Sequence, residues 1–194
     1  LPSSIMDVGG SSWHGKVGIE PSGGDFQAIV AGVDAAEGKQ RAKQWLQGIK
    51  KSEAIYNSAE GIVKAVDRGD IAAGIIYHYD WFRMRAEAPS STANTKLHYF
   101  GHHDPGSQMN VSGVGVLASS NQKKEARQFV AFLTGKQGQR DIAASDDFEY
   151  PLNPKVAANT ALKPLNTLDV PHITPGDIGD GGQAVTLLQQ AGIL

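Results

Sequence analysis

The stretch of sequence that decides the fold is a nearly continuous apolar run, Ile71-Ala72-Ala73-Gly74-Ile75-Ile76-Tyr77. A strand covered by helices on both faces has this composition, whereas a strand with one solvated face alternates apolar and polar residues. Gly69 and Asp70 precede the run, and polar side chains follow it. We therefore predict a strand over residues 71–77 inside a parallel sheet.

The sequence on either side alternates between short apolar stretches and helical patterns. We expect further strands at residues 16–19, 54–56, 97–100 and 111–117, and helices that begin near residues 25, 40, 57, 80, 121 and 182. Asn57 and Glu60 have the spacing of a capping box, and the helix after residue 121 is expected to bury Phe129. This order predicts an α/β fold with a mostly parallel sheet flanked by helices.

Composition excludes several classes of protein. Eighteen basic and 20 acidic residues give a net charge of −2, so the chain lacks the basic surface of a nucleic-acid-binding protein. The absence of cysteine excludes disulfide scaffolds, thiolate zinc sites and cysteine nucleophiles. No signal peptide is visible in the sequence, which opens with Leu1 and not with Met. We therefore expect a processed chain or one that starts within a longer protein.

Polar and aromatic side chains follow the central run, at the predicted strand end: Tyr77, His78, Tyr79, Asp80 and Trp81. Ligands of open α/β sheets bind outside the carboxyl ends of the strands. Phenolate and carboxylate oxygens are hard donors that suit hard cations. A tyrosine ionises near pH 10 unaided, so a highly charged cation would have to displace its proton. An aromatic patch that packs the strand end against a helix explains the pattern equally well.

Two turns before predicted helices contain small polar residues, Ser22-Gly23-Gly24 and Asn57-Ser58. Free N–H groups and the helix dipole favour anions at such positions. Ordinary capping explains both turns as well, and Asp25 would repel an anion from the first.

Other motifs give little support for catalysis. His102 and His103 are adjacent, and neighbouring side chains on an extended chain point to opposite faces, so they rarely bind one ion. The sequence contains no Gly-x-Ser-x-Gly elbow, phosphate-binding loop or dinucleotide fingerprint. A metal-dependent hydrolase is therefore the weakest alternative.

Several landmarks occur in an order and spacing that resemble one family: Trp13-His14-Gly15-Lys16-Val17-Gly18, Pro21-Ser22-Gly23-Gly24-Asp25-Phe26-Gln27, Asn57-Ser58, Tyr79-Asp80-Trp81-Phe82, Asp104-Pro105-Gly106, Glu149-Tyr150-Pro151-Leu152 and Ala191-Gly192-Ile193-Leu194. Over nearly its whole length the sequence resembles the periplasmic ferric-iron binding proteins of ABC importers. The resemblance implies a non-catalytic, two-lobed protein that carries Fe³⁺ to a membrane permease.

The resemblance also implies a set of site residues. Tyr79 corresponds to the first of two adjacent iron-binding tyrosines, and Asp80 stands at the second. Ser22, Gly23, Gly24 and Asn57 correspond to the residues that hold a synergistic phosphate or carbonate. Asp80 and Asp25 both add negative charge relative to the family pattern. A polyamine, thiamine or a phosphorylated small molecule such as a sugar phosphate is therefore an alternative cargo.

The domain organisation follows from the same resemblance. Residues 1–108 and about 150–194 are expected to form the second lobe, and residues 109–149 to belong to an incomplete first lobe. The first third of a typical member has no counterpart in this sequence. Residues 109–145 would then lack sheet neighbours, which predicts dimerisation or strand exchange between copies of this chain.

Overall fold

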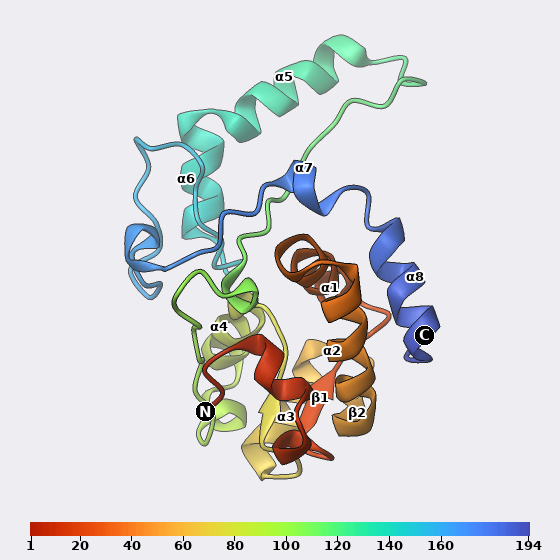
Figure 1. The fold of residues 1–194 in the computed structure, drawn as a ribbon. Coiled ribbons are helices and arrows are strands. Elements are labelled where there is room, and N and C mark those ends of the chain that lie inside the picture. Colours follow the sequence, from red (N-terminus) through yellow and green to blue (C-terminus); the bar gives the residue numbers. More distant parts are fainter. The chain divides into compact units, whose positions relative to one another are not determined.

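A computed structural model describes residues 1–194, apart from the side chains of residues 52 and 53. The chain forms two compact units (Figure 1). Unit 1 contains Leu1–Asn110 and Leu168–Leu194, and unit 2 contains Val111–Thr167. The assignment of these units to the lobes of a larger protein stays a prediction.

Unit 1 is built on a parallel sheet, as the alternation of strands and helices predicts. The strands are β1 (Val17–Ile19), β2 (Glu53–Ile55) and β3 (Ala73–Gly74), in the order β2-β1-β3. β3 is shorter than the predicted strand over residues 71–77, although the amide of Ile75 still donates to the carbonyl oxygen of Gly18 at 3.0 Å.

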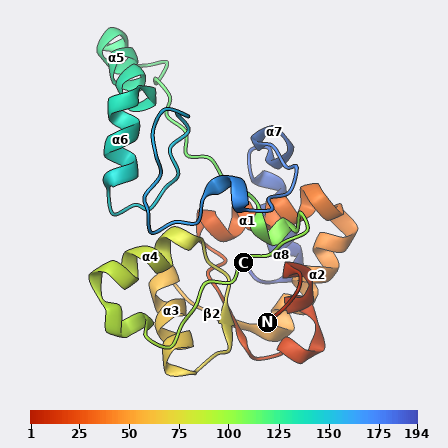
Figure 2. The ribbon, with the colours of Figure 1, turned by 90° about the vertical axis from the view of Figure 1, so that its left-hand side faces the viewer.

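Helices cover both faces of this sheet. α1 (Gly24–Glu37), α2 (Lys39–Ser52) and α8 (Gly182–Ala191) lie on one side of unit 1, and α3 (Ala59–Arg68) and α4 (His78–Glu87) on the other (Figure 2). Val17 and Ile19 are fully buried in the cluster that contains α1, α2 and α8. Gly18 faces the second cluster, which contains Ile62 of α3, because successive strand residues point to opposite faces.

The remaining elements are short. The 3-10 helices are η1 (Ile5–Gly9), η2 (Ser11–Trp13), η3 (Pro89–Thr92), η4 (Pro105–Ser107) and η5 (Leu165–Thr167), and α7 spans Pro175–Ile178. The predicted strand at residues 97–100 is wrong, because the sheet provides no ladder partner for this segment. None of the helices in the described part of the chain is long and apolar enough to span a membrane.

The capping box predicted for α3 is also wrong. Ser58 is the N-cap, and its hydroxyl accepts a hydrogen bond from the amide of Gly61 at 3.1 Å. Because the helix begins at Ala59, Glu60 lies one position too early to close a box and pairs with Lys64 instead. Gly69 ends the helix, with a φ of 77° that favours glycine.

Unit 2 contains α5 (Lys123–Thr134) and α6 (Lys136–Ala144) joined to irregular segments. The predicted buried strand at residues 111–117 is wrong: these residues are irregular, and Leu117 is 74% exposed. The expected burial of Phe129 is wrong too, since this side chain is 58% exposed. Within residues 111–167, all of them described, no strand is present for α5 to cover.

Candidate metal centre

The predicted site residues follow the carboxyl ends of the three parallel strands. Residues 20–24 come after β1, residues 56–58 after β2, and residues 75–80 after β3. Because parallel strands end at one edge of a sheet, the fold brings these segments to the same edge of unit 1, where α/β proteins bind ligands.

Tyr79 is the second residue of α4 and is partly buried. Its hydroxyl donates a hydrogen bond to Oδ2 of Asp25 in the first turn of α1. Its ring stacks on that of Tyr77, with the centroids 5.7 Å apart and the planes within 6°. The ring centroid of His78 lies 5.8 Å from that of Tyr79, and the two rings are nearly perpendicular at 73°. Tyr79 therefore connects α4 to α1 across the edge of the sheet.

The surroundings of Tyr79 keep its phenol protonated in the free protein. Burial raises the pKa of Tyr79 above its ordinary value of 10, and the hydrogen bond to Asp25 and the charges of Asp25 and Asp80 raise it further. A carboxylate that accepts a hydrogen bond from the phenol stabilises the neutral form of the phenol. Only a strong positive charge at the oxygen can reverse this preference.

Tyr77 is held in place by a residue that the sequence reasoning missed. Nε2 of Gln108 donates to the Tyr77 hydroxyl at 3.3 Å and to the carbonyl oxygen of Ala28 at 2.7 Å. Gln108 is buried, and burial raises the pKa of Tyr77. No local pattern marks Gln108, which lies 31 residues after Tyr77 in an irregular segment.

Asp80, the second predicted ligand, is turned into the protein. It is 6% exposed, and its Oδ1 accepts a hydrogen bond from Nη2 of Arg83 at 2.8 Å. Burial raises the pKa of Asp80 to about 6, with Arg83 opposing the shift and Asp25 and Glu20 adding to it. The charges of Asp25 and Glu20 thus reach Asp80, and three carboxyl groups make this edge acidic.

The predicted anion turn precedes α1. Gly23 is the N-cap of α1, which has no side-chain hydrogen bond at this end, and Ser22 is exposed. The side chain of Glu20 packs against the turn, since a Cβ added at Gly23 would lie 3.0 Å from its Cδ. Asn57 is exposed immediately before the cap of α3.

The two adjacent histidines have a structural role in unit 1. Their φ angles are 58° and 56°, so the chain turns sharply there. His102 donates its amide to Asp169, and Nδ1 of His103 lies 2.8 Å from the carbonyl oxygen of Val170. Among the residues whose side chains are described, no three His, Cys, Asp or Glu converge as a metal site.

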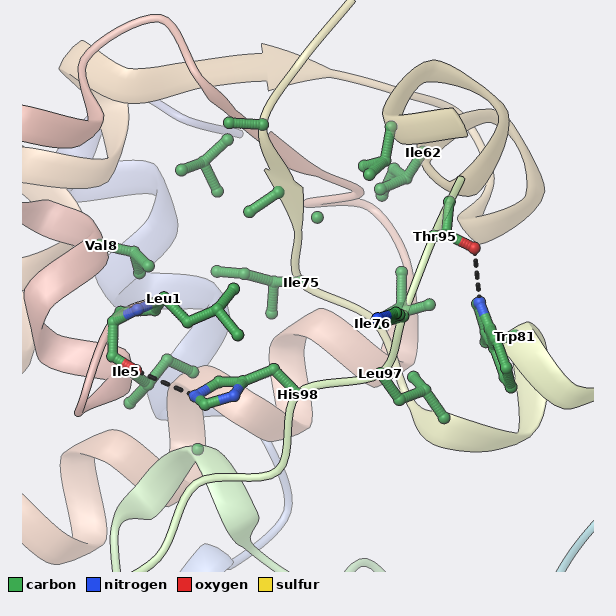
Figure 3. A pocket seen from close by; sticks show the side chains of 18 of the residues that line it. Leu1, Ile5, Val8, Ile62, Ile75, Ile76, Trp81, Thr95, Leu97 and His98 are labelled. Atoms are coloured by element: carbon green, nitrogen blue, oxygen red, sulfur yellow. Dashed lines mark hydrogen bonds between the residues drawn. The ribbon is translucent and has the colours of Figure 1, made fainter. Parts of the chain in front are cut away.

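A cavity of about 180 Å³ lies elsewhere in unit 1, between the amino-terminal segment, β3 and residues 95–98 (Figure 3). Aliphatic side chains such as Ile5, Val8 and Ile75 line it. At its rim Nε2 of His98 lies 2.9 Å from the carbonyl oxygen of Pro2. Neither Tyr79 nor Asp25 lines this cavity, so we treat it as separate from the acidic edge.

Comparison with known proteins identifies the family. The chain is 37% identical over 194 residues to an Fe(3+)-binding periplasmic protein of Serratia marcescens and 34% identical over 193 residues to the major ferric iron-binding protein of Neisseria gonorrhoeae. All of this chain aligns in both cases, and it spans 57% and 58% of those proteins.

The fold agrees with a solved structure. Iron-bound HitA from Pseudomonas aeruginosa is 39% identical and superposes with a TM-score of 0.91, over 99% of this chain and 62% of that one. A family model for bacterial extracellular solute-binding proteins matches residues 9–167. This match covers most of the sequence, and the chain belongs to the family of bacterial extracellular solute-binding proteins.

Proposed function

We propose that this chain is part of a periplasmic solute-binding protein that captures ferric iron and delivers it to an ABC permease in the membrane. Relatives at 34% and 37% identity are ferric-binding proteins, which supports iron as the cargo. The observation that carries the proposal is the Tyr79 phenol, held against Asp25 at the acidic edge of the sheet. The proposal includes capture and release and no catalytic step.

Tyr79 is the proposed primary ligand. It binds Fe³⁺ as phenolate, because the charge of the metal stabilises the ionised form that burial and Asp25 disfavour in the free protein. Asp80 is the second proposed ligand. To bind the metal, the Asp80 carboxylate has to give up the 2.8 Å hydrogen bond that it accepts from Arg83.

The anion side of the site is proposed to lie at the start of α1. The backbone at Ser22, Gly23 and Gly24, together with Asn57, would hold phosphate or carbonate against the iron. Two features support this role: Gly23 caps α1 without a side-chain hydrogen bond, and amide groups at a helix N-terminus favour negative charge.

The two proposed ligands would fill only part of a coordination shell. Tyr79 and Asp80 give two oxygen donors, and iron in proteins takes more. We therefore propose that further ligands come from residues outside this chain, and that tight binding needs the full-length protein. The chain spans 57% of its relative from Serratia marcescens, which leaves room for such residues.

A cationic organic cargo is the second candidate. The stacked rings of Tyr77 and Tyr79 lie beside acidic groups, and aromatic faces attract organic cations such as a polyamine or thiamine. The acidic edge disfavours a sugar phosphate. A metal-dependent hydrolase has the least support, since the relatives at 34% and 37% identity are ferric iron-binding proteins.

Self-association of this chain is a further part of the proposal. Unit 2 exposes Leu117, Phe129 and Phe132, and the rings of Phe129 and Phe132 stack with centroids 6.5 Å apart. Large exposed apolar patches favour association, so we propose that unit 2 forms dimers when residues 1–194 are studied alone. Strand exchange is not part of this proposal, because residues 111–167 contain no strand to exchange.

Ferric iron added to the full-length protein should produce a visible tyrosinate-to-iron charge-transfer band and raise the melting temperature. If neither change appears, while spermidine or thiamine raises the melting temperature, the cationic organic cargo replaces iron. Turnover of a generic phosphoester would instead support the hydrolase.

A further inference from the structure

One hydrogen bond at the candidate metal centre identifies the carboxylate that lies beside the Tyr79 hydroxyl. The Tyr79 hydroxyl donates to Oδ2 of Asp25, although the two residues are 54 positions apart and belong to different helices. Asp80 points elsewhere, to Arg83. The carboxylate that lies against the proposed iron-binding oxygen is therefore that of Asp25.

Asp25 also lies next to the turn, Ser22-Gly23-Gly24, that is proposed to hold an external anion. It lies in the first turn of α1, two residues after the N-cap Gly23. A carboxylate at this position satisfies the positive end of the helix dipole. Glu20 packs against the same turn, so an additional anion would meet two carboxylates. Like charges this close disfavour one another.

We infer that the Asp25 carboxylate is the anion of this site, so that ferric iron is held without phosphate or carbonate. The inference rests on the proposed capture of ferric iron, and it replaces the external anion of that proposal with a carboxylate of this chain. Ser22, Gly23 and Gly24 then present a built-in carboxylate at the start of α1 in place of a bound ion.

The binding step that follows is balanced in charge and protons. The O–H bond of Tyr79 breaks as its oxygen binds Fe³⁺, and the proton passes to Oδ2 of Asp25, which already accepts its hydrogen bond. Water takes the proton from Asp25, whose carboxylate then binds the metal. The iron stays ferric, and Tyr79 releases one proton for each iron bound.

The test uses full-length protein loaded from ferric nitrilotriacetate and passed by gel filtration into buffer without phosphate, carbonate or citrate. We expect the tyrosinate-to-iron band to form in this buffer and to keep its maximum when phosphate, carbonate or citrate is added. Asp25→Asn should lower the affinity for iron in the anion-free buffer about 10–100-fold, and phosphate should restore most of it.

Asp34→Asn is the matched control, since Asp34 lies nine residues further along α1, about 13 Å from Asp25 along the helix axis. It should behave as wild type. The inference is overturned if the wild-type band needs an added anion, or if Asp25→Asn leaves iron binding unchanged. Wild-type protein that shows no band with or without anions contradicts the proposed function itself. The wild-type anion test decides the question even if Asp25→Asn does not fold.

Discussion

Two residues at the edge of the sheet, Tyr79 and Asp80, lie in surroundings that disfavour their ionised forms in the free protein. Tyr79 is partly buried and hydrogen-bonded to a carboxylate, and Asp80 is buried beside further acidic groups. Such groups gain a stable partner when a cation enters, which is the physical basis for assigning the edge to a cationic ligand.

Asp80 predicts a pH dependence of stability that needs no ligand. Its pKa rises from 3.8 to about 6 on folding, so the folded protein holds this proton more tightly than the unfolded chain. The contribution of this proton to the stability of the folded protein is fully present below pH 3.8 and is lost as pH rises through about 6. In wild type the free energy of unfolding should fall by an amount on the order of 2 kcal/mol between about pH 4 and pH 7 because of Asp80, and Asp80→Asn should lack this decrease.

Urea unfolding of both proteins at the two pH values measures this difference. Parallel changes in the free energy of unfolding of wild type and Asp80→Asn would show that the surroundings of Asp80 do not raise its pKa.

At the start of α3, the neighbouring residues Asn57 and Ser58 should contribute differently to the stability of the helix. Ser58 caps the helix, so Ser58→Ala should lower the free energy of unfolding by about 1 kcal/mol. Asn57→Ala should change it by less than about 0.5 kcal/mol, as expected for an exposed side chain. Chemical denaturation of the two variants compares them directly, and an equal loss in both would contradict the assigned cap.

The contact between β3 and α3 depends on a glycine. A Cβ at Gly74 would lie 2.0 Å from Cγ2 of Ile62, too close without movement of the helix. Gly74→Ala should therefore cost about 1–3 kcal/mol, whereas Gly113→Ala, where no atom lies within 4 Å, should have little effect. A Gly74→Ala protein as stable as wild type would mean that α3 packs differently.

The elements also show where sequence patterns suffice. α1, α3 and α8 were predictable as helices because each carries its apolar residues on one face, although the cap of α3 was assigned one residue too early. The strands at residues 97–100 and 111–117 were not, because a strand exists only with a neighbour that pairs with it. The position of Tyr79 at the edge of the sheet was predictable from its place after an apolar run, but its contact with Asp25 joins segments 54 residues apart.

For the whole molecule, the two units differ in how well they bury their apolar residues. Unit 1 has fully buried clusters on both faces of its sheet, whereas α5 of unit 2 has no buried residue. Phe129→Glu combined with Phe132→Glu should therefore reduce self-association of residues 1–194 and change stability by less than about 0.5 kcal/mol.

Sedimentation velocity over a concentration series follows this association, and Lys123→Glu on the same helix is a control for charge alone. A wild-type chain that stays monomeric at high concentration would contradict the role of the exposed phenylalanines.

The proposal that Tyr79 binds ferric iron is tested most directly by a ferric titration of full-length wild type, Tyr79→Phe and Tyr56→Phe. The titration is followed by the visible tyrosinate-to-iron band. Tyr56 is the control because it packs on the α3 side of the sheet, in the cluster with Ile62. We expect a saturable band in wild type and in Tyr56→Phe, and its loss in Tyr79→Phe. A band of full intensity in Tyr79→Phe would show that Tyr79 is not the iron ligand.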